Sequence, residues 1–302
     1  MSTEKRNENF MLKQSRYSKG KKNVKQYSKN NASKKSGSGK NSYNAYYKKN
    51  DDGFQPKSNG KSNYGKKKYP SKSMGYPKKN AQKPSIKIAF LGGLNEIGKN
   101  ITLVECENDI IIIDCGMAFP DGDMLGVDLV IPDFTYIEQN ADRVKGIILT
   151  HGHEDHIGGL PFLLSKVNVP IYGTPLTLGL VGNKLKEHSL YNQSQLNVIN
   201  AGQSIKLGCM KIDFIHVNHS IPDAVAFAIH TPGGTIVHTG DFKIDCTPIT
   251  GDMIDLSSFA RVGDEGVLAL LSESTNAERP GYTPTERTVS DSLDNLFKAS
   301  GK

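Results

Sequence analysis

Residues 150–159, with the sequence THGHEDHIGG, place three histidines and two carboxylates within six consecutive positions. They follow an apolar run, Ile147 to Leu149, whose length and composition predict a short buried strand. The cluster is therefore predicted to lie in a loop at the C-terminal end of a strand, anchored at one end and able to bring its side chains together. Because imidazole and carboxylate are ligands of zinc and similar transition metals, the stretch predicts a metal site.

The spacing within this cluster indicates two metal ions rather than one. His151 and His153 are two positions apart, so in an extended segment they point to the same side. Asp155 and His156 follow as the chain begins to turn toward a helix, which Gly158-Gly159 permits, and they face elsewhere. The alternative is a solvated histidine-rich loop, as in an expression tag. It is disfavoured because tags do not follow a buried strand.

Charge divides the chain into two parts near residue 84. Residues 1–84 hold 23 Lys and Arg against 4 Asp and Glu, a net charge of +19, whereas residues 85–302 hold 15 against 27, a net charge of −12. The overall charge of +7 therefore combines a polycation with an acidic globule. Val24 is the only β-branched aliphatic residue before Ile86, so the first part has no core to offset the entropy of ordering. A disordered basic tail is predicted there.

This tail is a candidate RNA-binding arm, because lysines contact phosphates and tyrosine rings stack on unpaired bases. The alternatives are a solubilising extension and a contact with anionic lipid. The candidate RNA contacts are lysine runs and a tyrosine pair: Lys21, Lys22, Tyr46, Tyr47, Lys66, Lys67 and Lys68.

Nothing in the sequence predicts export or membrane insertion. No apolar segment follows the N-terminal charges, and the aliphatic run 110–113 is far too short to cross a bilayer. Cys106, Cys115, Cys209 and Cys246 lack CxxC spacing and are expected to be buried, reduced thiols. We expect a cytoplasmic protein that does not bind membranes.

The folded part is expected to begin near Ser85 and to mix strands with helices, with three strands and tight turns indicating an antiparallel start. The expected strands are 86–91, 101–106, 110–114, 147–149, 195–199, 204–207, 210–217, 224–230, 235–238 and 267–271. The expected helices are 134–139, 160–166, 175–188 and 285–299.

Residues 93–100, GLNEIGKN, nearly match the phosphate-binding pattern GxxxxGK[ST]. Asn100 stands where a Ser or Thr hydroxyl would hold magnesium, and a strand rather than a helix is expected to follow. We therefore reject nucleotide binding here. The segment is better interpreted as a tight connection whose glycines allow close approach of the backbone.

Three further candidate site residues stand at the ends of other expected strands. Asp114, just before Cys115-Gly116, is either a turn-former or a carboxylate that orients a neighbouring loop through hydrogen bonds. His219 and Asp241 each lie in a strand-end loop, where a single residue of either type is usually structural. Taken with the histidine cluster, both are expected to converge at one pole of a sandwich.

Together these motifs resemble a known family. HxHxDH at 151–156, followed by His219 and Asp241, with Asp114 upstream, resembles the metallo-β-lactamase fold over about residues 86–275. The wording around the motifs is similar to ribonuclease J, of the β-CASP branch: GGLNEIGKN at 92–100, HGHEDHIGG at 151–159, NHSIPDA at 218–224, TGDFKID at 239–245 and SESTNAERPG at 272–281. The resemblance implies an α/β fold, a metallo-β-lactamase αββα sandwich that is incomplete here.

The resemblance also implies two divalent metal ions, most simply zinc, with manganese as the alternative. The first ion would bind His151, His153 and His219. The second would bind Asp155, His156 and a further histidine, with Asp241 bridging both.

Three other assignments accompany this ligand set. Asp114 would orient the ligand loop, and Asp155 is counted as catalytic as well as a ligand. Glu273, which follows the strand 267–271, matches an acidic family position with a role in site architecture or proton transfer. The other histidines are predicted not to bind metal: His188, His216, His230 and His238.

The implied activity is that of a metal-dependent ribonuclease, a 5′-to-3′ exonuclease with possible endonuclease activity, acting in RNA decay and rRNA maturation by hydroxide attack on a phosphodiester. The implied partners are RNA, further copies of the chain, and RNA-decay or ribosome proteins. The alternative is a non-catalytic protein that binds RNA through its basic tail. A small-molecule hydrolase such as a thioesterase is disfavoured, because neither residues 272–281 nor the tail suits one.

The expected domains are a tail at 1–84, a metallo-β-lactamase domain at 85–281 and the start of a β-CASP domain at 282–302. Members of the family continue well beyond this point and supply the further histidine there. The chain is therefore expected to be a C-terminally truncated form with little or no nuclease activity alone.

Overall fold

The computed structural model describes residues 83–301. The predicted disordered tail, with all seven of its candidate RNA contacts, lies outside the described residues apart from its last two positions and stays a prediction. No helix within the described range combines the length and apolar character needed to cross a bilayer.

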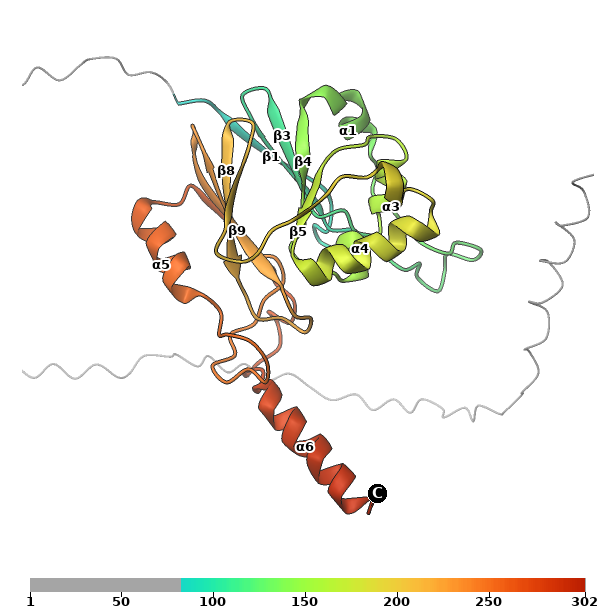
Figure 1. Ribbon diagram of the computed structural model, residues 1–302, viewed down its shortest axis with the longest axis vertical. Helices are drawn as coiled ribbons and strands as arrows, with labels where there is room; N and C mark the ends of the chain where they lie inside the picture. Colours follow the sequence, from blue (N-terminus) through green and yellow to red (C-terminus); the bar gives the residue numbers. More distant parts are fainter. Residues whose placement is uncertain (1–82, 302) are drawn as a thin grey trace, which may run out of the picture. The chain divides into compact units, whose positions relative to one another are not determined.

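Two β-sheets face each other at the centre of the described chain (Figure 1). The first sheet has the order β1 (Ile86–Gly92), β2 (Ile101–Cys106), β3 (Asp109–Ile113), β4 (Val144–Ile148), β5 (Ile171–Gly173) and β6 (Leu196–Val198). Strands β1 to β3 pair antiparallel, and β3 to β6 pair parallel. The antiparallel start expected from the sequence is confirmed. Strand β5 was not expected from the sequence.

The second sheet has five strands and is mostly antiparallel. Its order is β11 (Ala269–Leu271), β10 (Gly234–His238), β9 (Val225–Thr231), β8 (Met210–His216) and β7 (Ser204–Leu207). Only the edge pair β10–β11 is parallel. All five strands were expected from the sequence, with ends that differ by at most two residues.

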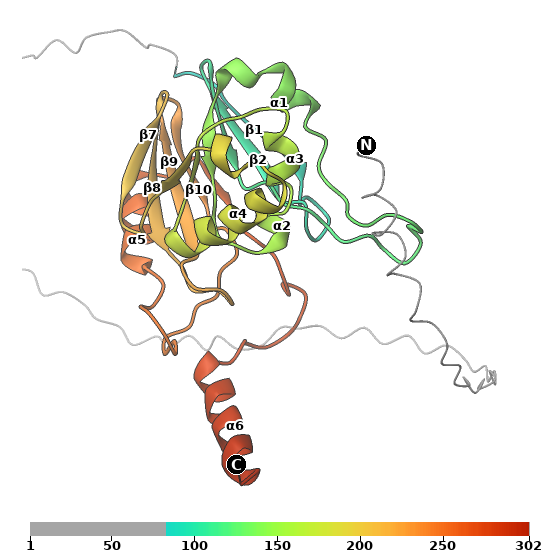
Figure 2. The ribbon, with the colours of Figure 1, turned by 45° about the vertical axis from the view of Figure 1, so that its right-hand side comes forward.

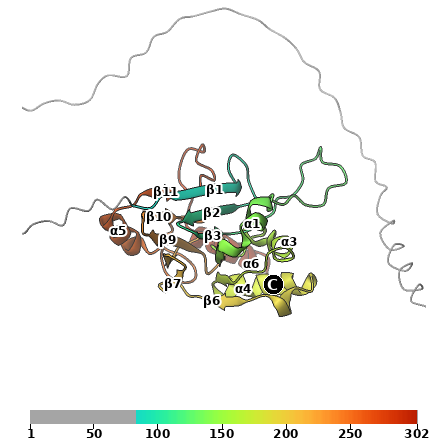
Figure 3. The same cartoon turned by 90° about the horizontal axis from the view of Figure 1, so that it is seen from above.

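Helices cover the outer faces of the two sheets, at opposite sides of the molecule when it is seen from above (Figure 3). The first sheet carries α1 (Thr135–Gln139), α2 (Glu154–Ile157), α3 (Leu160–Leu164) and α4 (Pro175–Glu187), with 3-10 turns at Ala141–Arg143 and Tyr191–Gln193. The second sheet carries α5 (Leu256–Glu265). The fold is therefore the predicted αββα sandwich.

The sandwich holds three apolar layers, and the period-two alternation of strands explains them. In β3, Ile110 and Ile112 pack toward the helices, whereas Ile111 and Ile113 pack toward the second sheet. The second sheet alternates in the same way. Phe227 of β9 faces the first sheet, and its small neighbours Ala226 and Ala228 pack beneath α5. A strand buried on both faces reads as a continuous apolar run, which is why β3 is four consecutive isoleucines.

Helix α5 is an element that the sequence analysis missed. It begins after Asp255, whose carboxylate accepts a hydrogen bond from the backbone N–H of Ser258 and caps the first turn. Its apolar residues Phe259 and Val262 pack on the outer face of the second sheet. The N-cap aspartate and this spacing were the available signals.

Helix α6 (Glu286–Ala299) extends away from both sheets, as Figure 1 shows, and none of its residues is buried. Its start is tied to the body because Asp245, itself buried, accepts a hydrogen bond from the Glu286 N–H, and Lys243 pairs with the Glu286 carboxylate. Its apolar residues form an exposed stripe at helical spacing: Val289, Leu293, Leu296 and Phe297.

All four cysteines are free thiols, as predicted. Cys106 and Cys115 are buried, whereas Cys209 is half-buried and Cys246 is exposed. The expectation of burial is therefore wrong for Cys246, which lies in the irregular segment after β10 rather than in a strand.

A buried carboxylate fastens β1 and β2 to the segment around α1. Glu105 is 6% exposed and accepts bonds from Lys87 (2.7 Å), Arg143 (2.9 Å) and the Tyr136 hydroxyl (2.8 Å). Its hydrogen bond with Lys87, followed by those with Arg143 and Tyr136, outweighs burial and lowers the pKa of Glu105 to about 2.

We expect Glu105→Gln to reduce the free energy of unfolding by about 2 kcal/mol at pH 7. The folded-state pKa lies below the ordinary value of 4.5, so this stability is complete above that value and is lost as pH falls toward about 2. Urea unfolding of parent and variant between pH 7 and pH 2.5 measures the difference. The control is Glu138→Gln, whose exposed pair with Lys166 should contribute less than about 0.5 kcal/mol. A Glu105 difference that does not change with pH would contradict this account.

Candidate metal centre

Four strand ends from the two sheets meet at one pole of the sandwich. β3 leads into Asp114, β4 into the histidine cluster, β8 into His219 and β10 into Asp241. Backbone hydrogen bonds join these ends: the Asp114 N–H donates to Ile148 O, and the Val225 N–H donates to Thr150 O. The second of these bonds links the two sheets directly, so loops far apart in sequence are held side by side.

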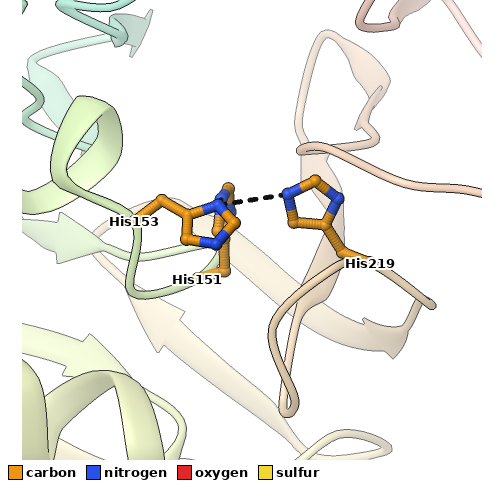
Figure 4. A group of neighbouring side chains, drawn as sticks. All are labelled: His151, His153 and His219. Carbon is orange, nitrogen blue, oxygen red and sulfur yellow. Dashed lines mark hydrogen bonds between the residues drawn. The ribbon is translucent and has the colours of Figure 1, made fainter. Parts of the chain in front are cut away.

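The first ligand group consists of His151, His153 and His219 (Figure 4). His151 and His153 come from the loop after β4, and His219 approaches from the opposite loop after β8. His153 Nδ1 lies 3.0 Å from His151 Nε2 and 3.2 Å from His219 Nε2. Two nitrogens bonded at about 2.0–2.1 Å to a tetrahedral zinc ion are roughly 3.4 Å apart. The three histidines can therefore hold one ion if their ring nitrogens move slightly apart.

A second ligand group lies beside the first and contains His151, His156 and Asp241. The Asp241 carboxylate stands between the groups, because its Oδ1 is 3.4 Å from His156 Nε2 and its Oδ2 is 3.7 Å from His219 Nε2. Asp155 Oδ2 is 3.5 Å from His156 Nε2. All six sequence-predicted ligands are therefore brought to one place.

Two local features allow this convergence. The turn before Asp241 contains Gly240 at φ +57°, where a Cβ would lie 2.9 Å from the Cβ of Thr150, so a larger residue would push the loops apart. Asp155 and His156 lie within helix α2, which lies beside α4 (Figure 2). Glu154 of α2 pairs with Lys184 of α4 at 2.8 Å. Helix α2 lies inside the cluster and was not expected from the sequence, whereas the helix expected from residue 160 is α3.

Asp114 fixes the ligand loop from beneath. Its Oδ1 accepts a hydrogen bond from the Thr150 N–H, and its Oδ2 accepts from the Thr150 hydroxyl and lies 2.8 Å from His156 Nδ1. The residue is 2% exposed and holds φ +59°, a conformation that non-glycine residues rarely adopt. The sequence left Asp114 as either a turn-former or a carboxylate that orients a neighbouring loop, and these contacts agree with the second role.

These contacts also set which ring nitrogens are free. His156 Nδ1–H donates to Asp114, and His151 Nδ1 lies 3.0 Å from the Thr150 hydroxyl, which itself donates to Asp114. The Nε2 atoms of both rings are thereby directed toward the ligand groups. An imidazole supported in this way is held in the orientation and tautomer that metal binding requires.

The electrostatics differ between the two groups. Burial, followed by the neighbouring charge of His156, lowers the pKa of His151 to about 2, and burial also lowers the pKa of His219. Both are therefore neutral near pH 7, as metal ligands must be. Burial opposes the charge of His156 too, but Asp114 and Asp241 outweigh it and raise its pKa to about 10. Its Nε2 proton must leave before that nitrogen can bind a metal ion.

Glu273 is not brought into either ligand group. Its Oε2 accepts a hydrogen bond from the Thr275 N–H within its own turn, and its backbone N–H donates to the Thr239 hydroxyl, two residues before Asp241. Its role in catalysis stays a prediction.

The remaining histidines have other contacts, and none belongs to a ligand group among the described residues. His188 packs on the ring of Phe162, His216 bonds to the Asp252 carbonyl and His230 bonds to Asp213. His238 accepts a hydrogen bond from the Gly240 N–H through Nδ1.

Two residues of the site were not assigned a role from the sequence. Thr150 joins Asp114 to both His151 and His156, and Asn100 contacts Asp155 and His156. The only sequence signal for Thr150 was its place beside the cluster. Asn100 was noticed only as the mismatch in a rejected phosphate-binding pattern.

Comparison with known proteins decides the family. Residues 94–277 match the family model described as the metallo-beta-lactamase superfamily. The chain belongs to this superfamily. The match includes every strand end that contributes a ligand, and the predicted fold class is confirmed.

Curated relatives place the chain near ribonuclease J. It is 51% identical to ribonuclease J 1 of Streptococcus pyogenes over 203 residues, which are 67% of this chain and 36% of that protein. It is 48% identical to ribonuclease J of Helicobacter pylori, over 72% of this chain and 32% of that protein. It is 46% identical to ribonuclease J2 of Bacillus subtilis, over 74% of this chain and 40% of that protein. The resemblance read from the motifs is confirmed. The chain spans about a third of the length of these relatives.

Among solved structures, a protein of unknown function from Enterococcus faecalis has a TM-score of 0.54 and 17% identity, and the match covers 70% of this chain and 57% of that one. At this identity the likeness supports the fold alone.

Asp114→Asn is expected to weaken zinc binding by about 10- to 100-fold, because the neutral amide no longer holds the protonated Nδ1 of His156 with a charged acceptor. Zinc affinity is measured by competition with a chromophoric chelator. Asp213→Asn, which replaces a carboxylate paired with His230 outside both ligand groups, is the control and should leave zinc affinity unchanged. Equal zinc affinity in the parent and in Asp114→Asn would show that the carboxylate does not support the ligands.

Proposed function

We propose that this protein is a metal-dependent ribonuclease of the ribonuclease J type, which hydrolyses RNA phosphodiesters at a dinuclear metal site. The proposed ligands of the first ion are His151, His153 and His219, and those of the second are Asp155 and His156, with Asp241 shared by both. Zinc is the expected metal, with manganese as the alternative.

The observation that carries this proposal is the position of Asp241. One carboxylate directs its two oxygens to two different imidazoles, Oδ1 to His156 Nε2 at 3.4 Å and Oδ2 to His219 Nε2 at 3.7 Å. A bridging carboxylate of this kind suits two ions a few ångströms apart, the arrangement used for phosphodiester hydrolysis. The similarity to proteins named ribonuclease J supports RNA as the substrate.

Two bound divalent ions would supply the activated water and the positive charge that stabilises the phosphodiester in its transition state. The chain supplies the geometry. Asp114 and Thr150 hold His156 and His151, so that the ligand atoms are fixed before any ion arrives. Asp155 is 35% exposed and therefore borders solvent, where a carboxylate can accept a proton from the attacking water.

Several finer assignments belong to the same proposal. They are 5′-to-3′ exonucleolysis with endonucleolytic cuts, a role in RNA decay and rRNA maturation, a cytoplasmic location, and partners that include further copies of the chain and RNA-decay or ribosome proteins. Glu273 is proposed to contribute through the backbone beside Asp241 rather than by direct contact with a ligand.

The proposed domain boundary near residue 282 is supported by α6. Residues up to 281 contain all of the described strands, whereas α6 buries no residue and presents an apolar stripe to solvent. A helix with one apolar face normally packs that face on another element. We therefore assign residues 85–281 to the metallo-β-lactamase domain and residues 282–302 to the start of a second one.

The second candidate is a non-catalytic RNA-binding protein, which the charge of residues 1–84 favours. In this case affinity would come from phosphate contacts and would fall steeply with salt. The two candidates predict different effects of changing the metal centre.

We expect metal-loaded protein in large excess over labelled RNA to cleave it at most slowly in a single turnover, in keeping with the little or no activity expected of this chain alone. His151→Ala should abolish that cleavage while RNA binding remains. The expected rate is low, because among residues 83–301 the second ion has only Asp155, His156 and the shared Asp241 as ligands. His188→Ala, an exposed histidine at the end of α4, is the matched control and should cleave like the parent.

Chelation with EDTA should remove cleavage in the parent and in His188→Ala alike. If His151→Ala or EDTA has no effect, the proposed site is not the catalytic centre. If the metal-loaded parent binds RNA and never cleaves it, the RNA-binding alternative is favoured for this chain.

A further inference from the structure

We infer that Asn100 is a positioning residue that holds Asp155 and His156 ready for the second metal ion. This inference rests on the proposed dinuclear site and deepens it, because it separates the support of the second ligand group from that of the first. The residue belongs to the segment 93–100, which is interpreted from the sequence only as a tight connection.

Asn100 contacts two proposed ligands of the second ion, Asp155 and His156, through both its backbone and its side chain. Its backbone N–H donates to Asp155 O at 3.0 Å. Its side-chain Nδ2 lies 3.1 Å from Asp155 O, 3.3 Å from Asp155 Oδ2 and 3.2 Å from His156 Nε2. Each of these atoms belongs to a proposed ligand of the second ion.

The chemistry of these neighbours fixes how the amide is turned. Carbonyl and carboxylate oxygens only accept hydrogen bonds, so the NH₂ group rather than Oδ1 must face Asp155. His156 Nδ1 carries the hydrogen donated to Asp114. In the neutral ring Nε2 is therefore a bare acceptor, aimed at the same NH₂ group. Asn100 thus holds Asp155 through its carbonyl and carboxylate oxygens, and it keeps these bonds when an ion binds His156 Nε2.

The loop around Asn100 is shaped for this contact. Gly93 has φ +82°, and a Cβ there would lie 2.4 Å from Asn100 Oδ1, so only glycine leaves room for the amide. On the other side, Asn100 O accepts a hydrogen bond from the Gly116 N–H, two residues after Asp114. The Asn100 residue is therefore held on its side-chain side by Gly93 in the loop after β1, and through its backbone carbonyl by Gly116 in the loop after β3.

The first ligand group receives no contact from Asn100. His153 and His219 are positioned by each other and by the ends of β4 and β8. Loss of the Asn100 amide should consequently weaken the binding of the second metal ion and leave that of the first unchanged. A residue that merely supported the fold would affect both.

The test is a zinc titration of the full chain in competition with a chromophoric chelator, for the parent, Asn100→Ala and Asn100→Ser. The parent should bind two zinc ions, and His156→Ala identifies which of them belongs to the second group. We expect both Asn100 variants to weaken that same ion by about 10- to 100-fold and to change the other by less than about threefold. Asn100→Ser keeps a small polar side chain in case the alanine variant folds poorly.

Asn197→Ala is the matched control, because this half-buried asparagine also donates to a backbone carbonyl, that of Ile171, far from the site in sequence. It should leave both zinc affinities unchanged, and thermal unfolding shows whether its cost in stability is similar. If the parent binds two ions and the Asn100 variants bind both with parental affinity, or lose both equally, the inference is wrong and the proposed function stands. If the parent binds fewer than two ions, the dinuclear site and the inference fail together.

Discussion

The buried carboxylate of Asp114 is the constraint on which the metal centre depends. A carboxyl group at 2% exposure is costly to bury unless its oxygens are hydrogen-bonded, and here the backbone and hydroxyl of Thr150 and the ring of His156 satisfy them. These bonds fix the position of Thr150 at the start of the ligand loop and the orientation of the His156 ring. The unusual φ of Asp114 is held in place by the same contacts, which is the pattern expected where strain serves a site.

The sandwich supplies what Asp114 alone cannot, namely the meeting of distant segments. The isoleucines of β3 bind it on one face to the helices and on the other to the second sheet, so the strand ends of both sheets are held at fixed separation. His219 and Asp241 then reach the histidine cluster from the opposite sheet. The ligands converge because β3 is packed against the helices on one face and against the second sheet on the other. The polar contacts at the pole then adjust the distances between ligands that this packing has already set.

Much of this arrangement was readable from the sequence, because its signals are local. The isoleucine run predicted a short strand, and the spacing of His151, His153, Asp155 and His156 predicted ligands that divide two and two. Other features depend on contacts between distant segments and left no local pattern. The role of Thr150 depends on Asp114, 36 residues earlier, and that of Asn100 depends on Asp155, 55 residues later. Glu273 stood at a strand end like the ligands, yet its carboxylate turns back to its own backbone.

The most direct measurement is anomalous diffraction at the zinc edge from crystals of this chain grown with zinc. The account predicts two peaks roughly 3.5–4 Å apart, one beside His151 Nε2, His153 Nδ1 and His219 Nε2, the other beside Asp155 and His156, with Asp241 between them. A single peak, or peaks bound elsewhere on the chain with this pole left empty, would contradict it.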